Sequence, residues 1–226
     1  MGKIKSGVFL ILLLISSSIF AEELTPAGGW YVRFDAGIST ASDPELKIPS
    51  GPIPADLGSS PILGGGLGYS LVPGIRADLT LTYRSGFEQI SGFPAMPQGV
   101  ADFRSLATLL SLYLDVLSSE RVSPYAGFGI GFARNDLGRI TITNPDGSRL
   151  GTIEGKSKTG YAWQFCAGGS FQLGDQWLLD AGYHYLKGGD YESKDLLVFS
   201  DGSSVFAKDK AKFRSHEFIV SLQYTF

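Results

Sequence analysis

Few side chains in this sequence could carry acid–base or nucleophilic chemistry. There are two histidines, His184 and His216, and one cysteine, Cys166. Hydrolysis or acyl transfer would need a nucleophile and a histidine within hydrogen-bonding reach, together with a group that orients the histidine. Glu217 directly follows His216, but neighbouring residues of a strand point to opposite faces, so these two cannot form one dyad. The sequence therefore favours a protein without enzymatic activity.

A phosphate-binding loop is the second chemical possibility. Residues 151–157 read Gly-Thr-Ile-Glu-Gly-Lys-Ser, one residue short of Gly-x-x-x-x-Gly-Lys-Ser, and no strand-then-helix pattern surrounds them. A single cysteine excludes an intrachain disulfide and a zinc cluster, and we expect that Cys166 is a small buried or lumen-facing residue. The net charge of -3 gives no basic footprint for nucleic acid. We expect no cofactor, no metal and no nucleic-acid partner.

Charged and polar side chains of both signs occur within segments that also carry large apolar residues. Because side chains alternate along a strand, these polar residues share one face and the apolar residues share the other. Charges at membrane depth are costly unless they are paired or hydrated. We expect the polar residues to face inward as an ion-pair network. The network comprises Arg33, Asp35, Arg76, Asp78, Asp180, His184 and Glu217.

Period-two alternation of apolar and polar residues predicts eight strands. Segment 106–115 could also form a helix, but we favour a strand because its neighbours are all strands. Two of the strands carry glycines on one face, at positions 64, 66 and 68 and at 127, 129 and 131, which we expect to make space for long inward side chains. The strands are 30–38, 63–71, 75–84, 106–115, 125–133, 161–171, 177–185 and 213–226.

The connections between these strands alternate between long and short. The long ones are 40–61, 85–102, 135–158 and 187–212. We expect 40–61 to be a loop without regular structure, whereas 135–158 and 187–212 each contain a hairpin signal. Membrane barrels have this asymmetry, with brief periplasmic turns and long outer loops.

Aromatic residues support the same topology. If the first strand runs outward, one aromatic girdle lies at each membrane interface, as membrane barrels require. The periplasmic rim would hold Trp30, Tyr69, Trp177, Tyr224 and Phe226, and the outer rim Tyr83, Phe132, Trp163, Tyr183 and Tyr185. Arg84 would lie near the outer rim and contribute little to stability. The predicted fold is all-β, an eight-stranded antiparallel up-and-down transmembrane β-barrel with short periplasmic turns and long extracellular loops.

The N-terminal residues predict export. Lys3 and Lys5 precede a short apolar run and then Ala21, the arrangement of a secretory signal peptide cleaved after Ala21. We therefore expect residues 1–21 to be removed and residues 22–226 to form the barrel in the outer membrane of a Gram-negative cell.

The chain resembles the opacity-type surface proteins and the Brucella-type outer-membrane antigens. Residues 124–131, 183–185 and 224–226 carry the resemblance, although His184 stands where that family has an arginine. The resemblance implies that Tyr224 and Phe226 form an assembly signal for the barrel-insertion machinery. The lipid A deacylases, a related class of barrel, carry a serine two residues after the corresponding histidine. Here Leu186 occupies that position, two residues after His184.

These observations predict a barrel with a packed polar lumen that acts through its outer loops as a surface-exposed structural, adhesion or antigen protein. The expected partners are outer-membrane lipids and lipopolysaccharide, the barrel-insertion machinery, and a host or envelope macromolecule. Two alternatives stay open, a lipid-modifying outer-membrane enzyme and a small low-conductance porin.

Overall fold

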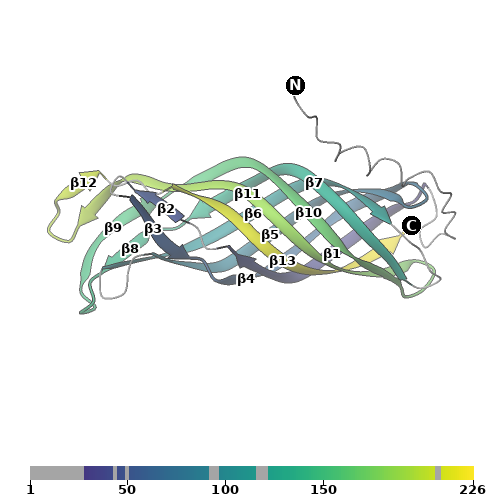
Figure 1. The fold of residues 1–226 in the computed structure, drawn as a ribbon, viewed down its shortest axis with the longest axis horizontal. Coiled ribbons are helices and arrows are strands. Elements are labelled where there is room, and N and C mark those ends of the chain that lie inside the picture. The colour runs from purple at the N-terminus through teal and green to yellow at the C-terminus, as the bar shows by residue number, and fades with distance from the viewer. Residues whose placement is uncertain (1–27, 43–44, 49–50, 92–96, 116–121, 207–209) are drawn as a thin grey trace, which may run out of the picture.

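The computed structural model describes residues 28–42, 45–48, 51–91, 97–115, 122–206 and 210–226 (Figure 1). The predicted signal peptide, residues 1–21, and the predicted turn at 118–120 lie outside the described residues. All regular secondary structure in these ranges is β-strand. No helix in the described ranges has the length and apolarity needed to cross a membrane.

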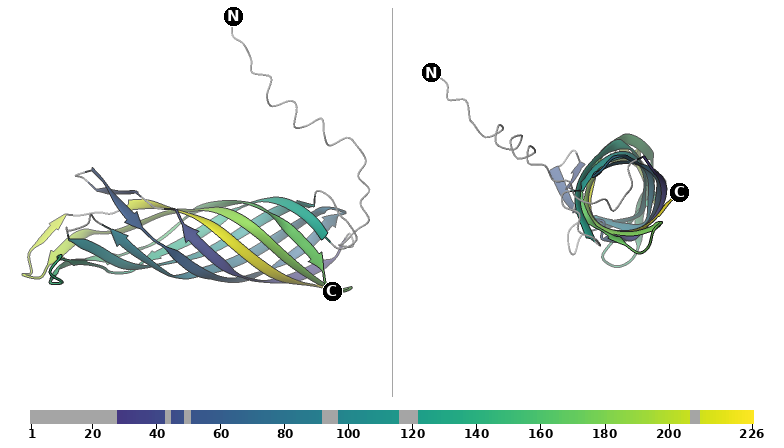
Figure 2. Two further views of the ribbon diagram at one scale, coloured as in Figure 1. Left: turned by 60° about the horizontal axis from the view of Figure 1, so that its bottom comes forward. Right: turned by 90° about the vertical axis from the view of Figure 1, so that its right-hand side faces the viewer.

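Eight long strands form a closed ring. Each pairs antiparallel with the next in the chain, and the last pairs with the first, so the sheet has no open edge at membrane level (Figure 2). This confirms the predicted up-and-down barrel. The strands are β1 (Trp30–Ala41), β4 (Ser59–Val72), β5 (Ile75–Ser91), β6 (Gln98–Asp115), β7 (Val122–Leu137), β10 (Ser157–Gln172), β11 (Trp177–Phe199) and β13 (Lys210–Thr225).

The faces of the ring are the reverse of those in a water-soluble barrel. On β5, Leu79 and Leu81 are 53% and 50% exposed on the outer wall, whereas Asp78 and Thr80 between and beside them are buried inside. Segment 106–115 follows the same pattern and is a strand, as predicted, with Leu110, Leu112 and Leu114 outward and Leu109 and Tyr113 inward. An apolar exterior around a polar interior is the pattern expected where lipid surrounds the wall.

Aromatic side chains meet at both ends of this apolar band. At the periplasmic rim the Trp30 and Tyr69 rings lie 4.9 Å apart, and those of Trp177 and Tyr224 lie 4.8 Å apart. At the outer rim, Trp163 contacts Tyr185 at 5.7 Å between ring centroids. Membrane barrels carry girdles of aromatic residues at both interfaces. These paired rings, on neighbouring strands at each end of the band, therefore mark the two interfaces of the membrane.

The strands continue well beyond the outer rim, into segments predicted as loops. Segment 85–102 is mostly strand, because β5 runs to Ser91 and β6 begins at Gln98. The prediction of an irregular loop at 40–61 is wrong, since it contains β2 (Glu45–Ile48), β3 (Gly51–Asp56) and the start of β4. Proline and serine hid these strands from the period-two pattern, while pairing with neighbouring strands stabilises them.

Both predicted hairpins are present in this extension. The first joins β8 (Ile140–Thr143) to β9 (Arg149–Gly155), and the second joins the end of β11 to β12 (Ser204–Phe206). Their turns use Gly147 and Gly202 at φ +83° and +85°, a conformation that favours glycine. The first hairpin is part of the barrel sheet, because β8 pairs with β6 and β9 pairs with β11.

The extension encloses an apolar core of its own. Phe87, Phe103, Phe213 and Tyr191 point inward and pack together, with ring centroids 4.8 to 5.8 Å apart. Above the membrane water replaces lipid outside the wall, so the ordinary hydrophobic driving force turns apolar residues inward. The period-two pattern of the sequence does not predict this core.

Replacing Phe103 with alanine should loosen the extension and leave the membrane barrel intact. Truncating a buried phenylalanine typically costs about 3–5 kcal/mol. Hydrogen exchange should accelerate in β8, β9 and the outer halves of β5 and β6, and stay unchanged at the periplasmic ends of the strands. Phe132→Ala, on the exposed wall, is the control. Equal exchange in the two variants would contradict a separate outer core.

Candidate functional site: the barrel interior

The structure places all seven residues of the predicted network inside the barrel. They come from four strands, β1, β5, β11 and β13, and each is between 0% and 5% exposed. Arginine side chains reach across the interior, so most contacts join strands that are not neighbours. Three groups of contacts can be distinguished, each centred on an arginine.

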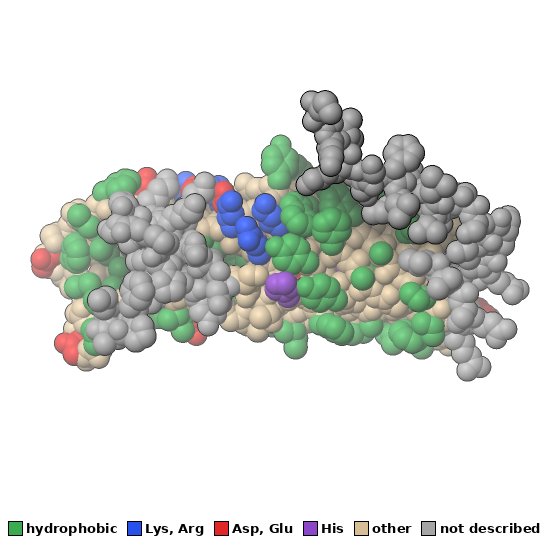
Figure 3. All heavy atoms as spheres, in the orientation of Figure 1, with side chains coloured by type: hydrophobic (Ala, Val, Ile, Leu, Met, Phe, Trp, Pro, Cys, Tyr) green, Lys and Arg blue, Asp and Glu red, His purple; other side chains and the backbone are tan. Residues whose placement is uncertain are grey.

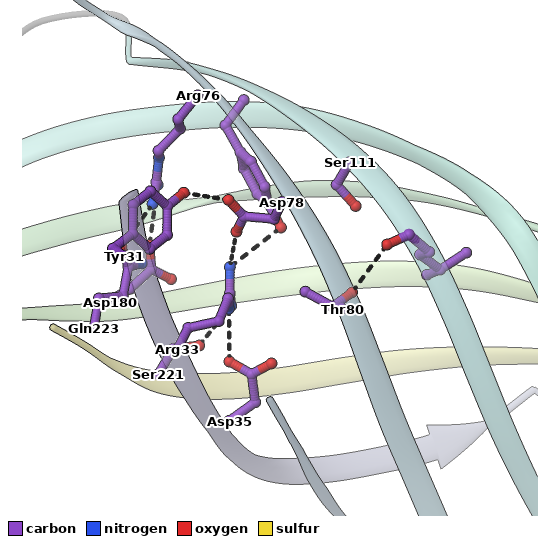
Figure 4. Close-up of polar contacts among 12 residues, drawn as sticks. Tyr31, Arg33, Asp35, Arg76, Asp78, Thr80, Ser111, Asp180, Ser221 and Gln223 are labelled. Atoms are coloured by element: carbon purple, nitrogen blue, oxygen red, sulfur yellow. Dashed lines mark hydrogen bonds and ion pairs between the residues drawn. The ribbon is translucent and has the colours of Figure 1, made fainter. Parts of the chain in front are cut away.

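Arg33 is the centre of the first group (Figure 4). Its Nε donates to Asp35 Oδ1 at 2.9 Å, Nη1 to Asp78 Oδ2 at 2.5 Å, and Nη2 to Ser221 Oγ at 2.7 Å. The Tyr31 hydroxyl donates to the other carboxylate oxygen of Asp78. The guanidinium is therefore bound by two carboxylates and a hydroxyl, from three strands.

Arg76 is the centre of the second group, nearer the periplasmic end. Its Nη2 donates to Asp180 Oδ2 at 3.1 Å, while the Tyr125 hydroxyl donates to Asp180 Oδ1 at 2.7 Å. The guanidinium carbon lies 4.8 Å from the ring centroids of both Tyr113 and Tyr125. Arg76 thus combines an ion pair with cation–π contacts, which gain strength away from water. Its Nε also lies 3.7 Å from Asp115 Oδ1.

Arg84 forms the third group, and the expectation that it contributes little is wrong. It is 1% exposed, and its Nε and Nη2 donate to the two oxygens of Glu217 at 2.6 and 2.8 Å. Ser39 and Ser215 donate to the same carboxylate at 2.9 and 2.7 Å. Because the wall continues beyond the outer girdle, Arg84 lies inside the barrel and not at its mouth.

Buried acidic groups outnumber buried arginines in the described part of the interior. Three guanidiniums face four fully buried carboxylates, those of Asp35, Asp78, Asp180 and Glu217. Hydroxyl donors from Tyr31, Tyr125 and several serines provide the remaining partners for these oxygens. The two tyrosines were missed from sequence, although each lies on the inward phase, two residues before Arg33 and Gly127 respectively.

Inward glycines on two strands leave room for these side chains. A Cβ built on Gly68 would lie within 2.5 Å of three ring and hydroxyl atoms of Tyr31, and one on Gly127 would lie 2.7 Å from both Cys166 Sγ and the Tyr113 ring. The glycine pattern seen in the sequence therefore has a steric reason at these two positions.

His184 lies between two groups that would suit a catalytic set. Register places Cys166 on one side of it and Glu217 on the other, all facing inward. The described hydrogen bonds do not join them, since His184 Nδ1 lies 3.4 Å from Gln164 Oε1 and Glu217 is bound by Arg84 and two serines. Cys166 is buried against Tyr113 and Tyr125. Within the described ranges, no His, Cys, Asp and Glu side chains gather as a metal site.

A second set of ion pairs holds the outer extension together. Glu192 on β11 accepts hydrogen bonds from Lys156 at 2.9 Å and from Lys158 at 3.2 Å. Arg139 and Glu154 pair at 2.7 Å at the base of the β8–β9 hairpin. The Glu192 contacts link β11 to the junction of β9 and β10, whereas the Arg139–Glu154 pair closes the base of the hairpin itself.

Removing either Arg76 or Arg84 should destabilise the barrel. A buried pair broken on one side leaves an uncompensated charge, which typically costs about 3–5 kcal/mol. Arg134→Ala is the matched control, because Arg134 pairs with Asp136 on the exposed surface, where a pair contributes under about 1 kcal/mol. Denaturant unfolding, followed by tryptophan fluorescence, measures the free energy of unfolding of each of the three variants. Arg76→Ala or Arg84→Ala unfolding like Arg134→Ala would contradict the network.

Acid should loosen the contact of β11 with Lys156 and Lys158, at the start of β10 in the extension. The hydrogen bond from Lys156, helped by Lys158, lowers the pKa of Glu192 to about 2, against about 4.3 for a free glutamate. A lowered pKa means that the contribution to stability is present above about pH 4.3 and is lost as the pH falls towards 2. Limited proteolysis of the extension across this range should show the change in the wild type. A Glu192→Gln protein should lack this acid-dependent increase in proteolysis. The same pH response in the wild type and in Glu192→Gln would contradict the role of Glu192.

Comparison with known proteins agrees with this geometry. The family described as "Outer membrane protein beta-barrel domain" matches residues 7–226. A Rickettsia typhi protein named "Putative adhesin" is 27% identical, covering 93% of each chain, and "Outer membrane protein PagN" of Salmonella typhimurium is 26% identical, covering 73% of each.

Two solved structures share the fold. Neisserial surface protein A has a TM-score of 0.51 at 19% identity, covering 87% of this chain and 97% of its own. OprG of Pseudomonas aeruginosa has a TM-score of 0.54 at 14% identity, covering 88% and 96%. With the closed ring, the aromatic rims and the family match, the chain belongs to the outer membrane β-barrel protein family and resides in the outer membrane of a Gram-negative bacterium.

Proposed function

We propose that this protein is a surface adhesin, in which a closed barrel anchors a rigid extracellular extension that binds a host or envelope macromolecule. The observation that carries the proposal is an apolar patch on the β11–β12 hairpin, far outside the lipid. The same exposed surface would also serve a structural or antigenic role.

The apolar patch consists of Leu196, Val198 and Phe206, which are 49%, 41% and 65% exposed. Leu196 is directly opposite Phe206, and Val198 follows Leu196 on the same face of the strand. Leu196 lies eleven residues beyond Tyr185 of the outer girdle, about 36 Å of strand at roughly 3.3 Å per residue. At that distance the patch faces water, and contiguous apolar surface in water is typical of binding sites.

The hairpin also presents a strand edge. In the extension β6, β8, β9 and β11 pair in sequence, and β12 lies at the end of this sheet, where its only pairing among the described residues is with β11. Figure 1 shows β12 at the extremity of the molecule. An edge strand can accept an additional strand from a partner, and the neighbouring apolar side chains would select among partners.

The relatives support the proposal, since one is named an adhesin. The interior supports an anchoring role, because its arginines, tyrosines and carboxylates fill the space that a pore would need. Among the described contacts, His184 bonds no carboxylate that could orient it for catalysis. These features favour a closed binding protein over a porin or a lipid-modifying enzyme.

Export and assembly belong to the same proposal. Residues 1–21 would be removed on export. Tyr224 and Phe226 would be read by the insertion machinery, and their rings lie 5.6 Å apart beside Trp177 at the periplasmic rim.

The double variant Leu196→Ser/Phe206→Ser should lose adhesion while the barrel stays folded. Both side chains are exposed, so their replacement removes binding surface with little effect on packing. The assay is attachment of bacteria displaying each variant to cultured cells and to extracellular matrix, normalised to surface display. Lys194→Ser, exposed on the same strand, is the control and should adhere normally. Undiminished adhesion by the double variant would refute the assigned patch.

A further inference from the structure

A basic cluster lies on the outside of the barrel wall, immediately above the outer aromatic girdle. It is formed by Lys187 on β11 and by Arg214 and Lys212 on β13. Lys187 is directly opposite Arg214, and Lys212 is two residues further out on the same exposed face. Figure 3 shows basic side chains gathered beside a histidine at the border of the apolar surface.

The three cations are arranged unfavourably for a protein without a ligand. None of the three takes part in the ion pairs found among the described residues, unlike Arg139, Lys156 and Lys158 of the extension. Asp190 stands opposite Lys212, but its carboxylate pairs with Lys158 at 3.9 Å. Neighbouring strands lie about 4.8 Å apart, so the positive groups repel one another, and like charges directly opposite each other destabilise a sheet. An anion bound between these cations would replace their mutual repulsion with attraction and would stabilise the sheet.

An apolar groove begins next to the cluster. Trp163 lines its near end, and the Lys187 ammonium lies 5.8 Å from the centroid of the Trp163 ring. Further along, the groove is lined by Tyr161, Phe132, Ile130 and Leu110, and its volume is about 750 Å³. It crosses β10, β7 and β6 on the lipid-facing wall, in the half of the band nearer the outer girdle. Aromatic and aliphatic walls of this kind suit acyl chains.

We propose that this wall is a binding site for a phosphorylated, multiply acylated glycolipid of the outer leaflet, that is, lipid A. The phosphate groups would bind Lys187, Arg214 and Lys212, and an acyl chain would lie in the groove beyond Trp163. The position at headgroup depth on the extracellular side, the cluster of three cations and the adjoining groove all point to the same amphipathic anion. The site is separate from the hairpin patch, so adhesion and lipid binding can fail independently.

The test measures lipid binding to the folded barrel in phosphatidylcholine nanodiscs, by native mass spectrometry at several lipid concentrations. The probes are diphosphorylated lipid A, the same lipid without phosphates, its diphosphorylated disaccharide without acyl chains, and phosphatidylglycerol. The wild type should bind diphosphorylated lipid A most tightly. Removing either the phosphates or the acyl chains should weaken binding.

The variant Lys187→Ala/Arg214→Ala should bind lipid A about 30-fold more weakly, since each basic side chain near an anionic lipid contributes a factor of about five. Arg139→Ala/Arg149→Ala removes the same charge from the exposed β8–β9 hairpin, away from the groove, and should bind like the wild type. Heat-modifiable migration on a gel checks that every variant is folded. Equal binding of lipid A by the two double variants would overturn the site. Equal binding of phosphatidylglycerol and lipid A by the wild type would overturn the lipid A assignment.

Discussion

The structure depends on pairing charges inside a narrow ring. An eight-stranded barrel has an interior just wide enough for side chains to fill, and in the membrane no bulk water surrounds the wall. Each arginine that enters this space must therefore meet carboxylates from elsewhere on the wall. Arg33, Arg76 and Arg84 do so at three successive levels, and the contacts of each span several strands. The network thus fixes the relative positions of distant strands and leaves little space for solutes.

The interior changes character along the barrel axis because the surroundings change. Within the lipid band the apolar side chains face outward and the interior is polar. Beyond the outer girdle, water surrounds the wall, and the interior fills with Phe87, Phe103, Phe213 and their neighbours. One continuous set of strands therefore has a polar core in the membrane and an apolar core outside it. The outer part therefore carries the β8–β9 and β11–β12 hairpins outside the membrane without a separate domain.

Period-two alternation was sufficient to predict the eight strands, their inward faces and the aromatic rims, because lipid on one side makes that alternation strict. It was not sufficient where the surroundings change. Segment 40–61 has little alternation because its strands pair outside the membrane, and Arg84 was placed at the rim because the strand was assumed to end there. Tyr31 and Tyr125 share the inward phase of Arg33 and Gly127, but only charged residues and a histidine were assigned to the network. Partners within the network could not be predicted, because they depend on stagger between strands that are far apart in the chain.

The central claim is that the interior is closed by its own side chains, and single-channel recording in planar bilayers tests it most directly. The purified barrel should show no steady conductance in symmetric salt at either polarity. Arg76→Ala, if it remains inserted, should at most produce brief and irregular openings. A stable open level in the wild type, with an ion selectivity that changes in Arg76→Ala, would contradict the account and identify the protein as a small porin.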